Sequence, residues 1–312
     1  MGKIKDELKK NKFIYDQYKS WESNRKLTKH YKFVNRSNNK QKLCIILAGY
    51  KEFLWDDTLG RIYNFIPDDY DVCLVSSGLF SNKLDEFSRK NKWSYVSVKR
   101  NNVALAQNVA ISLFPNATDI LKIDEDIFIT DGMVRKLEET FDRVKDYDTG
   151  IVSPTIPING FGYNKILDFY NLTDIYKEKF ENPIYAAGPK YMIESNPEVA
   201  KFFWGKGGYL KQLDKINSDF LNTKFNYSAC PIRLSIGCIL FKRDLWNSMK
   251  MFDVSYRGSD MGRDEEQIDS YCMLNSRAII VSGNAVAGHL SFGTQNNPMK
   301  SFFLKNKVNF NV

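Results

Sequence analysis

Short apolar runs recur along residues 43–124, and each is followed by a stretch whose apolar positions have helical spacing. The apolar runs predict strands at residues 43–48, 71–75, 94–98 and 120–124. The stretches between them predict helices at residues 57–65, 82–91 and 102–114. Strand and helix alternate at the spacing of βαβ units. This alternation predicts an α/β fold with a mostly parallel sheet and helices on both faces.

The pattern changes after Gly150. Residues 151–154 predict a fifth strand, but residues 155–230 are rich in aromatic residues, Asn, Gly and Pro, with no βαβ rhythm. In this segment Trp204 and Tyr209 offer flat faces to sugars or bases. The alternative is a core-packed aromatic cluster beside a turn, above all for Phe202 and Phe203. Sheet-like runs return at residues 234–241, 277–281 and 288–290, and helices are expected at residues 243–251 and 264–275.

The fourth predicted strand runs directly into three acids, Asp124, Glu125 and Asp126. Adjacent carboxylates repel one another and are costly to desolvate, so a cation is expected at this strand end. Oxygen ligands suit a hard divalent ion, Mg²⁺ or Mn²⁺, which commonly brings phosphate oxygens with it. Gly49 and residues 76–78 follow other strands. Ligands of such sheets bind beyond the carboxyl ends of the strands.

Positive charge is concentrated at the start of the chain. Residues 1–42 carry 13 of the 45 Lys and Arg residues but 4 of the 37 Asp and Glu residues, which leaves 32 and 33 for the rest. A nucleic-acid enzyme would spread basic residues over its binding face, so no nucleic-acid partner is expected. Apolar residues at roughly helical spacing in residues 1–30 predict a helix. It either docks on the body or attaches to an anionic membrane surface.

Composition places the chain among large α/β proteins. With 312 residues and 43% apolar content it can bury a substantial core. No apolar run has the length of a membrane span, and the charged N-terminus does not fit a secretory signal, so a cytoplasmic protein is expected. The five cysteines include no CxxC pair, which predicts buried thiols rather than disulfides or a zinc site.

Asp124-Glu125-Asp126 at a strand end resembles the DxD motif of GT-A glycosyltransferases. The motif order over roughly residues 43–290 resembles family 2 of that group. Asn101–Asn108 is similar to the family pattern N-x-G-x-A-x-A-R-N, and Asp264-Glu265 lies where the family has an E-D pair. Further approximate matches are Gly237, Phe241, Arg243 and His289. Two departures are Gln107, where Arg is common, and Ser76-Ser77, where acids often follow the second strand.

The resemblance implies transfer of a hexosyl or N-acetylhexosaminyl group from a nucleotide diphosphate, expected to be UDP, to a hydroxyl of a glycan or glycolipid. It implies that Asp124 and Asp126 hold Mn²⁺ or Mg²⁺, with His289 either a further ligand or a structural residue. Glu265 or Asp264 would be the catalytic base of an inverting transfer, and helix capping is the alternative for these acids.

Contacts to the nucleotide-sugar donor are implied for the residues at the strand ends and on the motif helix. They are Ala48, Gly49, Tyr50, Ser76, Ser77, Asn102, Asn108, Asp124 and Glu125. A role in bacterial surface polysaccharide synthesis follows, in a cytoplasmic protein or one peripheral to the inner face of the membrane.

The sequence divides into four expected parts. They are a basic helical extension with a linker (residues 1–42), a nucleotide-sugar-binding half (43–154), an acceptor-binding and catalytic half (155–295) and a basic tail (296–312). Two other functions stay open. One is a sugar-nucleotide nucleotidyltransferase, although residues 47–51 lack the Gly-rich, Arg-containing loop of such enzymes. The other is a non-catalytic glycan- or lipid-binding module.

Overall fold

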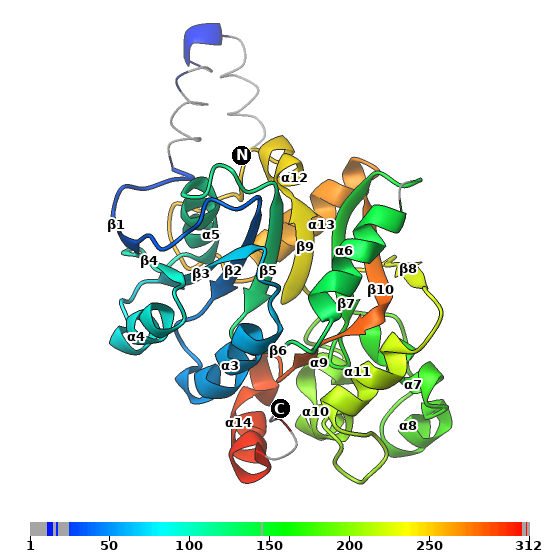
Figure 1. Ribbon diagram of the computed structural model, residues 1–312. Coiled ribbons are helices and arrows are strands. Elements are labelled where there is room, and N and C mark those ends of the chain that lie inside the picture. The colour runs from blue at the N-terminus through cyan, green and yellow to red at the C-terminus, as the bar shows by residue number, and fades with distance from the viewer. Residues whose placement is uncertain (1–10, 15–16, 18–24, 145, 308–309, 311–312) are drawn as a thin grey trace.

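The computed structural model describes residues 11–14, 17, 25–144, 146–307 and 310. Within them a nine-stranded sheet has the order β1-β4-β3-β2-β5-β9-β7-β10-β8, and a two-stranded sheet pairs β11 with β6 (Figure 1). The strands are β1 (Tyr31–Val34), β2 (Lys42–Leu47), β3 (Tyr70–Ser77), β4 (Ser94–Val98), β5 (Asp119–Asp124), β6 (Ile127–Phe128), β7 (Thr149–Thr155), β8 (Tyr227–Ala229), β9 (Cys238–Lys242), β10 (Ala278–Val286) and β11 (Gly288–His289).

The α/β fold expected from the sequence is confirmed. In the large sheet β4, β3, β2 and β5 are parallel neighbours, and so are β7 and β10. Strand β9 lies antiparallel between β5 and β7, so those two groups run in the same direction. Strands β1 and β8 pair antiparallel at the two edges. The sheet is therefore mostly parallel, and most of its strands deliver their carboxyl ends to one edge.

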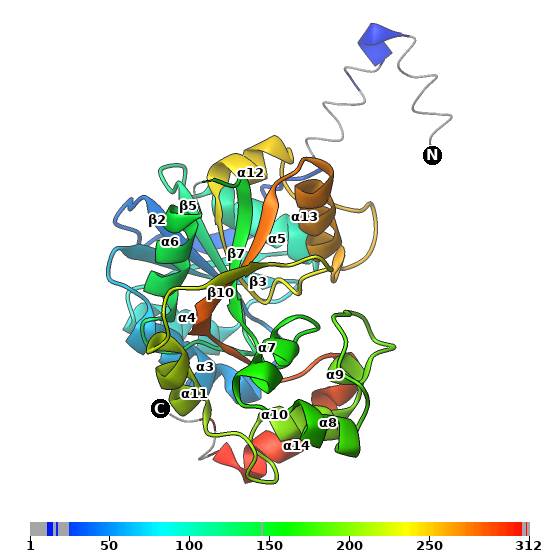
Figure 2. The same cartoon turned by 90° about the vertical axis from the view of Figure 1, so that its right-hand side faces the viewer.

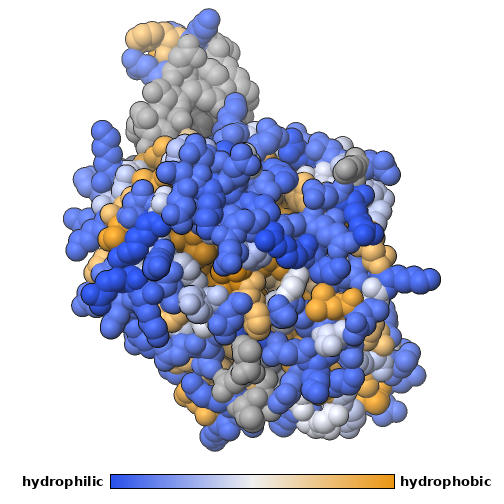
Figure 3. All heavy atoms as spheres, viewed as in Figure 1, coloured by the Kyte–Doolittle hydropathy of each residue, from blue (hydrophilic) through white to orange (hydrophobic). Residues whose placement is uncertain are grey.

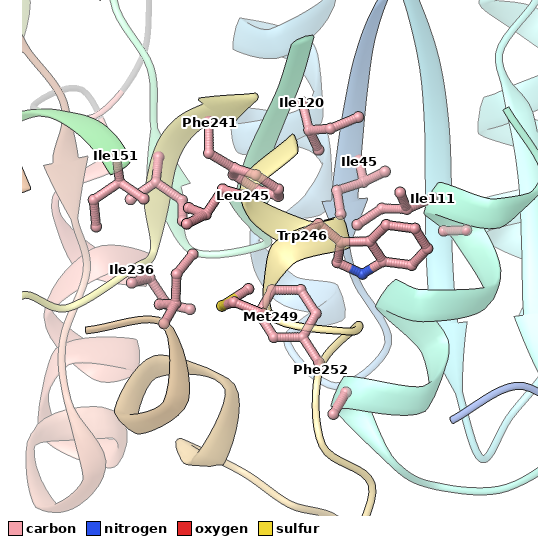
Figure 4. Packing of buried hydrophobic residues seen from close by; sticks show 14 of the residues in the cluster. Ile45, Ile111, Ile120, Ile151, Ile236, Phe241, Leu245, Trp246, Met249 and Phe252 are labelled. Carbon is pink, nitrogen blue, oxygen red and sulfur yellow. The ribbon is translucent and has the colours of Figure 1, made fainter. Parts of the chain in front are cut away.

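Helices cover both faces of this sheet. One face packs against α5 (Val103–Ser112), α12 (Arg243–Ser248) and α13 (Arg263–Leu274), and the other against α3 (Trp55–Phe65), α4 (Asn82–Lys90) and α6 (Met133–Arg143). Alternating residues of the central strands supply the two cores, as the pleat requires: Ile45 faces one cluster and Ile46 the other. Figure 4 shows Trp246, Met249 and Phe252 packed beside Ile111 of α5 in the first of these cores.

A third hydrophobic cluster lies below the sheet (Figure 2). It is built by α7 (Gly162–Phe169), α8 (Thr173–Lys179), α9 (Met192–Ser195), α10 (Pro197–Phe203), α11 (Leu213–Leu221) and α14 (Asn296–Lys305). Phe202 and Trp204 are buried in it, so the core-packing alternative holds for both. Residues 296–305, expected as part of a basic tail, form α14 because Met299 and Phe303 bury their side chains in this cluster.

Two further segments differ from expectation. Residues 31–34 of the N-terminal part form edge strand β1 beside β4, where residues 32–42 were predicted as a linker. The strand predicted at residues 234–241 begins only at Cys238. Backbone groups of residues 234–237 instead bond to site residues: the Leu234 amide donates to Asp269 and the Gly237 carbonyl accepts from the Asp124 amide.

The short elements between the strands and helices are 3₁₀ turns, η1 (Glu52–Leu54) and η2 (Gly293–Gln295). The face in Figure 3 is mainly hydrophilic, with apolar residues in small groups. Among the described residues, no helix combines the length and the apolar content needed to cross a bilayer.

Candidate active site at the carboxyl edge of the sheet

The backbone brings the acid triplet, the loop after β2 and strand β11 to one place. The Glu125 amide donates to the Leu47 carbonyl at 3.0 Å, which extends the pairing of β5 with β2. The Asp126 carbonyl accepts from the Leu290 amide at 3.1 Å, which holds β11 beside β6. Residues from positions 47 to 290 therefore meet where β5 ends, at the edge at which α/β sheets bind ligands.

The middle acid of the triplet is committed to the protein. One carboxylate oxygen of Glu125 accepts from the Gly49 amide at 2.9 Å and from Trp55 Nε1 at 2.6 Å. The other accepts from the Tyr50 amide at 3.1 Å. Glu125 is also buried, so its carboxylate fixes the loop after β2 against the end of β5. Glu125 was expected to contact the nucleotide-sugar donor, and in the structure its carboxylate oxygens accept from protein groups of and near the loop after β2.

Asp126 lies between two nitrogen groups. Its Oδ2 pairs with the Lys51 ammonium and lies 3.2 Å from Nε2 of His289. Burial alone would raise the pKa of Asp126, but Lys51 and His289 together hold it well below its ordinary value. Asp126 is therefore an anion in a buried site, which is costly unless cations stay beside it.

The hydrogen bonding of His289 bears on metal binding. Its Nδ1 lies 3.4 Å from the Ile158 carbonyl, an acceptor, so Nδ1 carries the proton that fills this contact. A proton on Nε2 fills the contact to Asp126, and in this form His289 lowers the pKa of that acid. Without that proton the Nε2 lone pair faces the carboxylate, and two acceptors repel unless a cation lies between them. A metal-ligating histidine has this arrangement, with its second nitrogen held by a carbonyl.

Asp124 is paired with a buried lysine. Lys122 Nζ lies 2.6 Å from Asp124 Oδ1 and donates to the Ile236 carbonyl at 2.8 Å. Burial raises the pKa of Asp124 to about 6 in spite of Lys122. Burial would also lower the pKa of Lys122, but Asp124 and Asp264 keep it above its ordinary value. Each terminal acid of the triplet thus has its own ammonium group.

The fit of these residues to a divalent ion rests on the Asp126–His289 pair. Among the described residues, no three His, Cys, Asp or Glu side chains are arranged as a ligand cluster. Asp126 and His289 offer one oxygen and one nitrogen. An ion held by them would take its remaining ligands from water and from phosphate oxygens, as Mg²⁺ and Mn²⁺ do. The pair fits a metal that arrives with a nucleoside diphosphate, whereas Asp124 is turned to Lys122.

Two acids at the start of α13, Asp264 and Glu265, reach the same region, where their charges act on Lys122. Asp264 accepts from Gln107 Nε2 of α5 at 2.7 Å, so the glutamine that departs from the family pattern positions this carboxylate. Glu265 pairs with Arg233 Nε at 2.8 Å and accepts from the Ile236 amide at 3.3 Å. Burial raises the pKa of Glu265 to about 7. A carboxyl group with this pKa is matched to proton transfer near neutral pH.

The residues at the carboxyl ends of β2 and β3 are linked by hydrogen bonds. Ser76 Oγ contacts the Leu79 carbonyl and the Tyr95 hydroxyl, both at 2.9 Å, and Tyr50 donates its hydroxyl to the Ser77 carbonyl at 2.8 Å. Ala48 is buried, and Gly49 is held by Glu125. Tyr50 is 61% exposed, which leaves one face of its ring open beside the acids.

The two asparagines of the motif helix have structural positions. Asn102 caps α5 by accepting from the Leu105 amide at 2.8 Å, and its amide nitrogen donates to Asp260 at 2.5 Å. Asn108 is fully buried, bonded to Trp246 Nε1 and to both backbone groups of Phe252. The structure does not bring Asn108 to the strand-end site.

Four site residues were not foreseen from the sequence: Lys51, Lys122, Glu194 and Arg233. Lys122 left a signal, because a lysine inside an apolar strand must find a buried partner. The other three lie in loops or in a short helix, where no local pattern marks them. Glu194 comes from α9 and Arg233 from the segment before β9, so only the tertiary fold places them near Glu265.

Comparison with known proteins gives structural likenesses only. No family model matches the chain, and no curated protein matches it in sequence. A structure of GalNAc-T7 with UDP, GalNAc and Mn²⁺ is 13% identical, with a TM-score of 0.48, over 83% of this chain and 45% of that one. The mannosyltransferase PcManGT from Pyrobaculum calidifontis, in complex with GDP-Man and Mn²⁺, is 17% identical, with a TM-score of 0.46, over 92% of this chain and 67% of that one. This chain thus spans less than half the length of GalNAc-T7. Likenesses at these TM-scores carry no argument about function.

Proposed function

We propose that the chain is a metal-dependent glycosyltransferase of the GT-A type, which moves a sugar from a nucleoside diphosphate to a hydroxyl acceptor. The observation that supports this most is the strand-end arrangement in which Asp126 and His289 face each other with a buried base candidate, Glu265, nearby in the fold. Lys51 and Lys122 add positive charge where a diphosphate would lie. The donor is proposed to be a UDP-linked hexose or N-acetylhexosamine, with Tyr50 beside the nucleobase.

Asp126 and His289 would hold Mn²⁺ or Mg²⁺, which, when bound, supplies positive charge to the diphosphate leaving group. Lys51, which pairs with Asp126, would donate to a phosphate oxygen of the donor. Glu265 would accept the proton of the acceptor hydroxyl while that oxygen bonds to the anomeric carbon. The bond from that carbon to the phosphate oxygen breaks, and its electron pair leaves with the diphosphate. Asp264, held by Gln107, would orient the acceptor or Glu265.

The acceptor is proposed to be a glycan or glycolipid hydroxyl bound by the half of the chain that includes α7 to α11. A role in cell-surface polysaccharide synthesis, on the cytoplasmic side of the membrane, belongs to the same proposal. Its support is the aromatic, loop-rich segment of residues 155–230 and the basic start of the chain.

A thermal-shift screen of nucleotide-sugars, each with and without Mn²⁺, tests the proposed function. Ligands that bind the native state raise its melting temperature by mass action. We expect UDP-sugars to raise Tm by several degrees with Mn²⁺ present and by much less without it, because phosphate oxygens complete the metal's ligands. A metal-independent shift, or none with any nucleotide-sugar, would exclude the proposed donor site.

The pKa of Glu265 generates a pH prediction. A base must be ionised, and burial raises the pKa of this carboxyl to about 7. We therefore expect kcat/KM to fall about tenfold per pH unit below pH 7 and to level off above it. Glu265→Gln should lower kcat by about 10²–10⁴-fold with donor affinity nearly unchanged.

Two variants accompany that measurement. Glu266→Gln makes the same change at the next position, where the side chain is exposed, and should leave kcat unaltered. Asp264→Asn should cost less than Glu265→Gln or act on the KM of the acceptor. A product with retained anomeric configuration, together with full activity of Glu265→Gln, would contradict the assignment of the base.

Membrane attachment of the basic start of the chain is proposed as well. Phe13 and Ile14 are 71% and 45% exposed among basic residues. Each Lys or Arg near an anionic surface contributes roughly 1 kcal/mol, and salt screens the attraction. In co-sedimentation with phosphatidylglycerol vesicles, the full chain should bind and release at high salt, and a chain lacking residues 1–24 should stay in solution. If the full and the shortened chain bind the vesicles equally, the membrane proposal is wrong and docking on the body is left as the role of the N-terminal segment.

A further inference from the structure

Glu265 is held by two protein donors in the arrangement that the structure has. One of its carboxylate oxygens, Oε1, is paired with Arg233 Nε at 2.8 Å. The other, Oε2, accepts from the Ile236 amide at 3.3 Å. The charged donor, Arg233, stabilises the ionised carboxylate and so weakens it as a base, and it occupies one of the lone pairs to which an acceptor hydroxyl could donate. This reasoning rests on the proposed function, in which Glu265 is the base.

Arg233 is the donor that can leave. The Ile236 amide belongs to the backbone beside β9, whereas Arg233 has a long side chain that is 41% exposed. Its guanidinium also lies near a second carboxylate, with Nη2 at 4.0 Å from Glu194 Oε2. A shift of about 1 Å would turn that separation into a hydrogen-bonded ion pair. Arg233 thus lies between two acids, hydrogen-bonded to Glu265 and in a longer ion pair with Glu194.

One carboxylate oxygen of Glu194 lacks a donor that its burial calls for, although the Gly188 amide donates to this carboxylate. Its side chain is 5% exposed, and among the described residues its Oε1 has no hydrogen-bond partner. A buried carboxylate oxygen without a donor destabilises the fold, so a group of this kind calls for an explanation. Arg233 and His289 are the positive groups whose fields act on it. Of the two, Arg233 has the longer side chain, and its guanidinium can move closer to the Glu194 carboxylate.

We propose that Arg233 transfers from Glu265 to Glu194 when the acceptor binds, so that Glu194 and Arg233 are positioning residues for the base. The transfer frees Oε1 of Glu265 for the acceptor hydroxyl. It also removes the nearest positive charge from Glu265, which strengthens it as a base. Glu194 gains a hydrogen-bonded ion pair with Arg233, whose Nη2 already lies nearest its Oε2, and this contact offsets the broken ion pair. Lys122, Asp264 and Asp269 remain around Glu265 in both states.

The transfer has a kinetic signature. The pH dependence of kcat/KM reports the free enzyme, in which Arg233 lies on Glu265, and that of kcat reports the complex, in which Arg233 has left. Loss of a positive neighbour raises the pKa of a carboxyl group. The acidic limb of kcat should therefore lie at higher pH than the acidic limb of kcat/KM in the unaltered enzyme.

Glu194→Gln removes the charge that draws Arg233 away. We expect kcat to fall roughly 10- to 100-fold, as for loss of one charged hydrogen bond. The two acidic limbs should coincide, the donor KM should stay within about twofold, and Tm should not fall. Glu194→Asp keeps the charge and should restore part of kcat and the separation of the limbs. Glu198→Gln, four residues along on an exposed position paired with Lys201, is the matched control and should resemble the unaltered enzyme.

Three outcomes would overturn the inference. The first is full kcat of Glu194→Gln with the two limbs still separated. The second is a loss confined to the donor KM, which would place Arg233 on the diphosphate. The third is a joint loss of Tm and activity in both Glu194 variants, which would make the residue structural. Failure of the proposed function is distinct, because it would show as no metal-dependent turnover of nucleotide-sugar by the unaltered enzyme.

Discussion

The compensation of buried carboxylates at the end of β5 is the constraint on which the rest of the site depends. Asp124, Glu125 and Asp126 follow one another at the end of β5, and different groups compensate the carboxylate of each. Glu125 takes backbone and indole donors, Asp124 takes Lys122, and Asp126 takes Lys51 and His289. Removing any of these partners would leave a buried charge or lone pair unmet, which costs more than the contact itself contributes. The loop after β2 and strand β11 are therefore held where the acids need them.

The segment before the antiparallel strand β9 takes part in the same compensation of buried carboxylates. This segment supplies the Ile236 carbonyl to Lys122, the Ile236 amide to Glu265 and the Gly237 carbonyl to the Asp124 amide. Backbone groups of one short segment thus link the acids of β5 to the acids of α13. Residues 234–237 give up ladder pairing for this role, so the acids at the end of β5 and the acids of α13 form one bonded unit.

The sequence predicted the elements that local pattern controls. Apolar runs located β2, β3, β4 and β5 to within a few residues, because buried parallel strands need continuous apolar side chains. The structure of residues 155–230 was less predictable from the sequence. Helices α7 to α11 bury their apolar residues against one another and against α14, and such packing leaves no simple period in a segment rich in turns. The α14 residues were placed in a tail for the same reason.

Site prediction divided along similar lines. The acid triplet and His289 were recognisable from their order along the chain, and one member of the triplet, Asp126, meets His289 in space. Asn108 was not recognisable as a core residue, since its role depends on Trp246 and Phe252, more than 130 positions away. Arg233 and Glu194 escaped detection because a lone charged residue in a loop has no local signature. The geometry shows that the Arg233 guanidinium lies between the carboxylates of Glu265 and Glu194.

The central claim is that Asp126 links metal to nucleotide at the strand end. Titration calorimetry of the nucleoside diphosphate, with and without Mn²⁺, measures that linkage directly, independently of turnover. The account predicts that Mn²⁺ strengthens binding at least tenfold in the unaltered chain and in Asp131→Asn, an exposed acid five residues on. It predicts no such gain in Asp126→Asn, with the fold intact by circular dichroism. An equal Mn²⁺-dependent gain in Asp126→Asn would contradict the account.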